Sequence, residues 1–262
     1  MNKREIDNLD KDRLLEAAKS GDFISSIYNY CDRWCEKCKF TEKCLNFRMI
    51  DNKIKSQNSN GNTNEPINNI EDSLKLAMEL IQDITKELNV KINDSEEKEI
   101  QNEQKRIDTK IKENSIIRQC RRYSKAVNDF LNDNSLYFGK ILGCEILSGD
   151  DSISKEKEAV EIIMWYNYMI EVKFARTLHG YYSKLDEEDE EDDNYDYDDK
   201  LVSARITIYS IDRLMAAWYF IYTTYSTYEE NAKDFLVMLA KIKNEIEQFI
   251  PEVVAYKRPY FD

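Results

Sequence analysis

Glycine and proline are scarce in this chain, and their scarcity limits how often the backbone can turn. Only six glycines and three prolines occur in 262 residues, whereas average proteins contain about 7% glycine and about 5% proline. Tight turns and strand ends depend heavily on these two residue types. Long helices with few connections are therefore favoured.

Apolar residues recur at helical spacing in most of the chain, and no segment alternates with period two for long enough to form a strand. An amphipathic helix is expected over 70–88, and a capping box of Thr227 and Glu230 is expected to open a last helix. The fold class is all-α, a multi-helix bundle with an N-terminal cysteine-rich helix-loop. The predicted helices span 10–19, 23–38, 70–88, 94–132 (one helix or two end to end), 155–184, 201–225 and 227–249, with a glycine-bearing turn over 136–151.

Changes in composition divide the chain into three parts. Residues 1–50 hold N-terminal helices with a four-cysteine cluster, 51–69 form an asparagine-rich linker expected to be disordered, and 70–262 form the helical bundle. An acidic loop over 186–199 interrupts the bundle and contributes eleven of the negative charges. Without these residues the net charge of the chain is -13 + 11 = -2. Most of the acidity therefore belongs to a solvated connector.

The chain shows no signal peptide and no apolar run of about 18 residues, so a soluble cytoplasmic protein without a membrane partner is expected.

Eight basic residues lie between Lys105 and Lys125. Because the sequence pI is about 4.8 and no nucleic-acid module is recognisable, an ordinary solvated helix face is favoured over a nucleic-acid site.

Four of the six cysteines fall within a short N-terminal segment, with the spacing C-x3-C-x2-C-x5-C. They are Cys31, Cys35, Cys38 and Cys44. If a helix continues through this segment, the first three share one face and Cys44 folds back from a short loop. In a reducing compartment such a cluster is more typical of a metal or redox site than of disulfides.

Four thiolates suit either tetrahedral zinc or a 4Fe-4S cluster. Zinc sites of four cysteines usually contain two separated C-x2-C pairs, and this segment contains one, which favours the 4Fe-4S cluster with zinc as the alternative. The inner C-x2-C-x5-C is similar to cluster-binding segments of auxiliary-cluster domains in radical enzymes and of some RecB-like nucleases. Unmetallated structural thiols remain a third interpretation, while Cys120 and Cys144 are expected to be small buried hydrophobes.

The radical S-adenosylmethionine interpretation of Cys31, Cys35 and Cys38 is rejected. Those enzymes alternate strands and helices and carry a glycine-bearing cofactor loop, which this sequence lacks.

Two strongly apolar helices carry charged residues, which are costly to bury unless they are paired. Cross-pairing is expected between the acids Glu161 or Glu171 and the bases Arg205 or Arg213, and between Asp212 and Lys173 or Arg176. The favoured interpretation is a buried structural network, and a polar substrate pocket is the alternative. A di-iron carboxylate site is excluded because His179 is the chain's one histidine.

The segments YCDRWCEKCKFTEKC, EIIMWYNYMIEVKFAR, SARITIYSIDRLMAAW and YKRPYFD together resemble an uncharacterised family of helical bacterial proteins. The resemblance implies a cytoplasmic location and a cysteine centre, and it implies no activity. Electron transfer or redox sensing through a 4Fe-4S cluster is the first functional expectation. A non-enzymatic adaptor with structural zinc and an unknown protein partner is the alternative, and catalytic residues are unknown.

Overall fold

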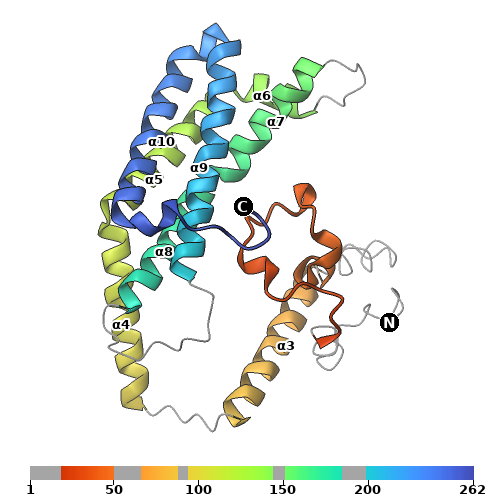
Figure 1. Ribbon diagram of the computed structural model, residues 1–262, viewed down its shortest axis with the longest axis vertical. Helices are drawn as coiled ribbons and strands as arrows, with labels where there is room; N and C mark the ends of the chain where they lie inside the picture. Colours follow the sequence, from red (N-terminus) through yellow and green to blue (C-terminus); the bar gives the residue numbers. More distant parts are fainter. Residues whose placement is uncertain (1–18, 50–65, 88–93, 144–150, 185–198) are drawn as a thin grey trace. The chain divides into compact units, whose positions relative to one another are not determined.

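The computed structural model describes residues 19–49, 66–87, 94–143, 151–184 and 199–262 (Figure 1). Every regular element in these ranges is helical, which confirms the all-α, multi-helix class. The predicted helix over 10–18, Cys144, linker residues 51–65 and acidic-loop residues 186–198 lie outside the described residues. No helix in the described ranges is long and apolar enough to cross a membrane.

The chain divides into two compact units, Met1–Gln101 and Asn102–Asp262. The boundary falls inside α4, so α3 belongs to the first unit, although the sequence analysis began the bundle at residue 70. The first unit contains η1 (Ile27–Asn29), η2 (Cys35–Lys37), η3 (Thr41–Lys43), α3 (Pro66–Glu87) and the start of α4 (Asp94–Glu113). The second contains α5 (Ser115–Asp133), α6 (Ser135–Gly143), α7 (Asp151–Tyr166), α8 (Met169–Lys184), α9 (Asp199–Thr224), η4 (Ser226–Tyr228), α10 (Glu229–Phe249) and η5 (Pro251–Val254).

Helix α9 is the central element of the second unit, and α7, α8 and α10 all pack against it (Figure 1). A helix that is apolar around most of its circumference must be covered on several sides. Its buried residues accordingly follow one another closely: Val202, Ser203, Ala204, Ile206, Thr207, Ile208, Ser210, Ile211, Leu214, Ala217, Trp218 and Ile221. The buried hydroxyls of Thr207 and Ser210 donate to carbonyls one turn earlier in α9, which satisfies them without a partner helix.

A buried aromatic cluster joins α5, α9 and α10. The Trp218 indole N–H donates to the Tyr123 hydroxyl at 2.8 Å, and both side chains are completely buried. Phe130 and Phe235 add rings whose centroids lie 5.7 and 4.5 Å from that of Trp218. Rings at such distances stabilise one another beyond the area they bury, so the cluster holds the three helices together.

Two predicted helix regions are each interrupted. The segment 94–132 forms α4 and α5, the second of the two alternatives, because the side chain of Asn114 caps α5 by accepting from Ile116 N–H at 2.9 Å. The segment 155–184, predicted as one helix, breaks at Asn167–Tyr168 between α7 and α8. There the Ser124 hydroxyl donates to the Asn167 carbonyl at 2.6 Å. A contact with α5 therefore satisfies a carbonyl beside the break.

Two smaller expectations are wrong. The predicted turn over 136–151 begins as helix α6, since Phe138 and Ile141 bury their side chains and hold two of its turns against the core. The capping box at Thr227 does not form, because Tyr228 occupies the N-cap position of α10 and makes no side-chain cap bond. The amphipathic helix over 70–88 is confirmed by α3, whose Leu74, Ile81 and Ile84 are exposed.

The last residues are held against α9 by an ion-pair cluster. Arg258 is buried, bonds the Asp262 carboxylate through Nη2 at 2.8 Å, and stacks 4.5 Å from the centroid of the Tyr209 ring. Arg205 of α9 donates to the same carboxylate at 2.9 Å. Burial alone would raise the pKa of Asp262, but hydrogen bonds from Arg258 and Arg205 outweigh it and lower that pKa to about 2.

Replacing Tyr123 by phenylalanine tests the aromatic cluster. The change leaves the buried Trp218 N–H without its acceptor, so the free energy of unfolding should fall by about 1–3 kcal/mol. Urea unfolding followed by tryptophan fluorescence measures this. A loss below about 0.5 kcal/mol would mean that the bond contributes little. Tyr182→Phe is the control, because its ring is not fully buried.

Replacing Asp262 by asparagine tests the ion-pair cluster. Because its pKa is lowered in the folded protein, the carboxylate stabilises the fold above its ordinary pKa of 3.8, and this contribution disappears as pH falls through about 2. At pH 7 the variant should lose about 2 kcal/mol, as expected for hydrogen bonds to a charged group. The difference from the parent protein should shrink between pH 4 and pH 2 in urea titrations. A pH-independent difference would contradict the electrostatic explanation.

Candidate metal centre

The cysteine segment is a closed loop. The Ile24 N–H donates to the Lys43 carbonyl at 3.0 Å, and the Lys43 ammonium donates to the Asp22 carbonyl at 3.4 Å. Cys31, Cys35 and Cys38 lie inside this loop and Cys44 follows its closing residue. Four cysteines that are up to thirteen positions apart are thereby gathered into one small part of the structure.

The predicted helix over 23–38 is wrong. Short 3-10 turns and bends occupy this stretch, and Ser26 and Arg33 adopt left-handed backbone conformations with φ of 56° and 64°. The Asp32 carboxylate accepts from the Trp34 N–H at 3.2 Å. Such a local side-chain bond competes with helical hydrogen bonding, so the first three cysteines do not share a helix face.

The Cys35 thiol lies near enough to the other three thiols for their charges to affect its pKa. Partial burial, followed by the proximity of Cys31, Cys44 and Cys38 and of Glu36, raises the pKa of Cys35 to about 11. Each neighbouring sulfur raises this pKa because two adjacent thiolates repel one another. All four side chains are half-buried, so they remain accessible to solvent.

Two hydrogen bonds involve the sulfurs directly. The Phe40 N–H donates to Cys38 Sγ at 3.4 Å, an interaction that favours a thiolate and that tunes the potential of a ligated iron-sulfur cluster. The Cys31 thiol donates to the Tyr28 carbonyl at 3.3 Å. Ligation would replace this second bond, because a thiolate has no proton to donate.

The surroundings carry charge that complements four thiolates. Residues 31–48 contain five lysines or arginines and three acids, a net charge of 5 - 3 = +2. Lys37 and Lys39 lie over the rings of Trp34 and Phe40, at 5.7 and 4.9 Å from the ring centroids. Four thiolates around one divalent ion, or around an oxidised 4Fe-4S cluster, carry a charge of about -2, which this local balance offsets.

Within the described residues, no group of three or more His, Cys, Asp or Glu side chains is already arranged to hold a metal ion. The four cysteines therefore fit a metal by donor chemistry and proximity rather than by finished coordination geometry.

Cys120 is not part of this cysteine group. It is completely buried on α5, and burial, followed by the charge of Glu171, raises its pKa to about 12. Its interpretation as a small hydrophobe is confirmed.

Five of the charged residues expected to pair between the two helices bond to other partners. Glu171 accepts from Arg121 of α5 at 2.7 Å, and Asp212 accepts from Lys243 of α10 at 2.6 Å. Arg213 lies 3.8 Å from Glu158 of α7. Arg176 pairs with Asp199 at 2.7 Å and Arg205 with Asp262. The partners are therefore distributed over four helices and the tail.

Most of these charges are also not buried. Lys173 is buried, whereas Arg176 and Asp212 are exposed and the others are half-buried: Glu161, Glu171, Arg205 and Arg213. Long side chains pack their stems against the core and keep their charges near water. Neither a single buried network nor a shared substrate pocket follows from this arrangement.

One buried carboxylate was missed. Glu156 of α7 is buried and accepts from the Tyr137 hydroxyl at 2.5 Å. Burial, followed by a hydrogen bond to Glu156, raises the pKa of Tyr225 to about 12. The sequence around Glu156 is polar and charged, so nothing in its pattern indicated burial.

The basic residues between Lys105 and Lys125 contribute partly to internal contacts. Lys110 lies 5.2 Å from the centroid of the Tyr182 ring, and Arg121 pairs with Glu171. These two side chains therefore also take part in contacts within the protein, and the expectation of an ordinary solvated face stays a prediction.

Comparison with known proteins found no matching family model, no matching curated protein and no matching solved structure. The resemblance to a family of helical bacterial proteins therefore stays a prediction.

Alkylation kinetics test the raised pKa of Cys35. With a pKa of about 11 instead of 9.0, the thiolate fraction at pH 8 is about 100-fold lower, so Cys35 in the metal-free protein should react with iodoacetamide tens of times more slowly than an unfolded peptide cysteine. Mass spectrometry of the digested protein measures this rate. A rate equal to that of the peptide would contradict the raised pKa of Cys35 and the partial burial that is its first cause.

The same shift predicts how the metal-free loop responds to alkali. Because the folded pKa lies above the unfolded value, the loop loses stability as pH rises from about 9 to about 11.

Proposed function

We propose that Cys31, Cys35, Cys38 and Cys44 hold a 4Fe-4S cluster and that the protein serves electron transfer or redox sensing in a reducing cytoplasm. The observation that carries the proposal is the closed loop in which Cys35 lies among the other three thiols. A bound cluster supplies one-electron redox chemistry, and four cysteine thiolates are its usual ligands.

The chain's own residues support a redox centre in three ways. The Phe40 N–H is directed at Cys38 Sγ, and hydrogen bonds to sulfur raise the potential of a cluster by stabilising its reduced form. The basic side chains of residues 31–48 balance the charge of four thiolates. The half-buried sulfurs keep the centre near the surface, which is where an electron partner can approach.

Structural zinc is the alternative, and the small size of the local core favours it. In the described residues 19–49, the buried side chains are Ile27 and Trp34. A segment with so small a core usually needs a metal or a disulfide to fold. In that case the segment serves as an adaptor surface for a protein partner, and no electron is transferred.

Anaerobic purification followed by a visible spectrum and metal analysis separates the two functions. A cluster should give a brown protein with broad absorption near about 400 nm and about four irons per chain. One zinc per chain without colour would contradict the cluster and support the adaptor. Neither metal at stoichiometric amount would contradict both.

Single serine variants of the four cysteines locate the centre. Each should lower bound iron or zinc several-fold and expose the loop to limited proteolysis. The melting temperature of the bundle, residues 102–262, should stay within about 2 °C, since the loop and the bundle belong to different compact units. Cys120→Ala is the matched control, because this cysteine is buried on α5. Full metal retention in all four serine variants would contradict the assignment.

A further inference from the structure

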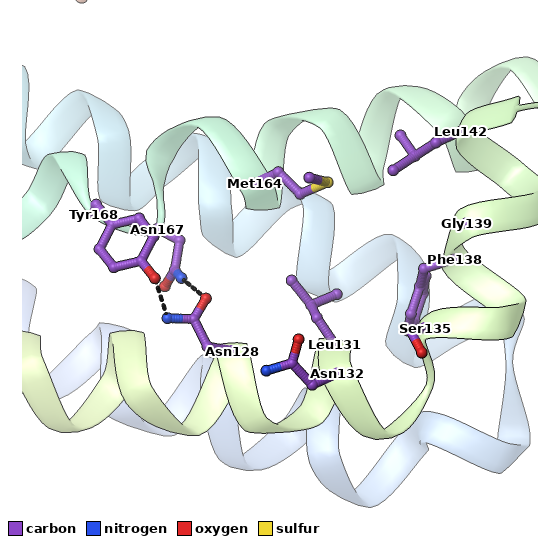
Figure 2. A pocket seen from close by; sticks show the side chains of 10 residues that line it. All are labelled: Asn128, Leu131, Asn132, Ser135, Phe138, Gly139, Leu142, Met164, Asn167 and Tyr168. Atoms are coloured by element: carbon purple, nitrogen blue, oxygen red, sulfur yellow. Dashed lines mark hydrogen bonds between the residues drawn. The ribbon is translucent and has the colours of Figure 1, made fainter.

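A pocket in the second unit lies where α5, α6 and the junction of α7 with α8 meet (Figure 2). Its volume is about 320 Å³, at the small end of the range that binds organic ligands. Leu131, Phe138, Leu142 and Met164 supply its apolar walls. None of its lining residues is charged, so the pocket suits a neutral molecule.

The pocket has a closed floor and an open rim. Phe138 and Asn167 are only 4% and 1% exposed, whereas Met164 and Tyr168 are 51% and 57% exposed. A small molecule can therefore enter past Met164 and Tyr168 without unfolding a helix.

The polar end of the pocket is built from two asparagines and a tyrosine. Asn167 Nδ2 donates to Asn128 Oδ1 at 2.9 Å, and Asn128 Nδ2 donates to the Tyr168 hydroxyl; Figure 2 shows these side chains pointing toward one another. Asn167 Nδ2 also donates to the Ser124 carbonyl at 3.4 Å. A carbonyl can only accept, so this bond fixes which end of the Asn167 amide is nitrogen.

The amide oxygen of Asn167 is buried and has no hydrogen-bond partner. Buried acceptors are almost always paired, and one that is not calls for an explanation. The oxygen belongs to a side chain that lines the pocket. A small rotation of the Asn167 side chain toward the pocket would let a ligand that carries an N–H or O–H group supply the missing donor.

We propose that this pocket binds a small, neutral, mainly apolar molecule that donates one hydrogen bond to Asn167 Oδ1. The apolar walls hold the body of the ligand, and the amide at the floor selects for its donor. The proposal concerns the bundle alone and does not depend on the cysteine centre.

Indole and benzofuran form a matched pair of probes for the pocket. The two have the same bicyclic shape, and only indole carries an N–H donor. The full chain, labelled with 13C at its methionine methyl groups, is titrated with each probe in turn. Indole should shift the Met164 methyl resonance in a saturable way, and its Kd should be at least fivefold lower than that of benzofuran. No shift at millimolar indole would overturn the site, and equal affinities would overturn the role of Asn167.

Filling the pocket provides the second measurement. A Cβ added at Gly139 meets no atom within 4 Å, so Gly139→Leu should fold and place its side chain in the space, raising the Kd for indole at least tenfold. Gly143→Leu is the matched control: it makes the same exchange four residues later in α6, also with nothing within 4 Å, at a residue that does not line the pocket. Indole binding that survives in Gly139→Leu, or is lost equally in Gly143→Leu, would overturn the assignment. Near-ultraviolet circular dichroism confirms that both variants are folded.

Discussion

The contact between Trp218 and Tyr123 is the constraint on which the second unit depends. It places α5 against α9, and the rings of Phe130 and Phe235 extend it to α10. Once α5 is positioned in this way, Ser124 and Asn128 on the same helix reach the chain at Asn167. The aromatic cluster therefore helps to position the α5 side chains that bond to Asn167 at the floor of the pocket, although neither Trp218 nor Tyr123 lines the pocket.

The two units are stabilised by different means. The bundle buries large side chains from α5 to η5 and has a core of ordinary kind. The described cysteine loop buries Ile27 and Trp34, and it relies on a few backbone bonds and on left-handed turns at Ser26 and Arg33. Conformations of this type persist only where the surroundings enforce them, and they cluster at functional sites. A metal ion or cluster bound by the cysteines would hold these conformations in place, which the small core alone does not do.

Elements with a strong and uninterrupted period could be predicted from the sequence, as α3, α9 and α10 show. The break at Asn167 could not, because a hydrogen bond from α5 accompanies it and no local residue marks it. The helix predicted over 23–38 was wrong for a related reason. The spacing of Phe23, Ile27 and Trp34 is helical, but the bond from the Trp34 N–H to Asp32 favours a turn. The prediction of ion-pair partners was the least successful, since spacing along one helix cannot show that Arg205 pairs with Asp262 or that Asp212 pairs with Lys243.

The position of α9 has a consequence for the way the bundle opens. Because α7, α8 and α10 cover it together, the amide protons on its buried faces have no short route to solvent, and a single neighbouring helix can fray without exposing the contacts of the other two. Exchange of these protons with deuterium then requires the bundle to open as a whole, so α9 reports the global free energy of unfolding while its neighbours report local fluctuations. Deuterium exchange of the buried α9 amides thus measures the stability of the whole unit.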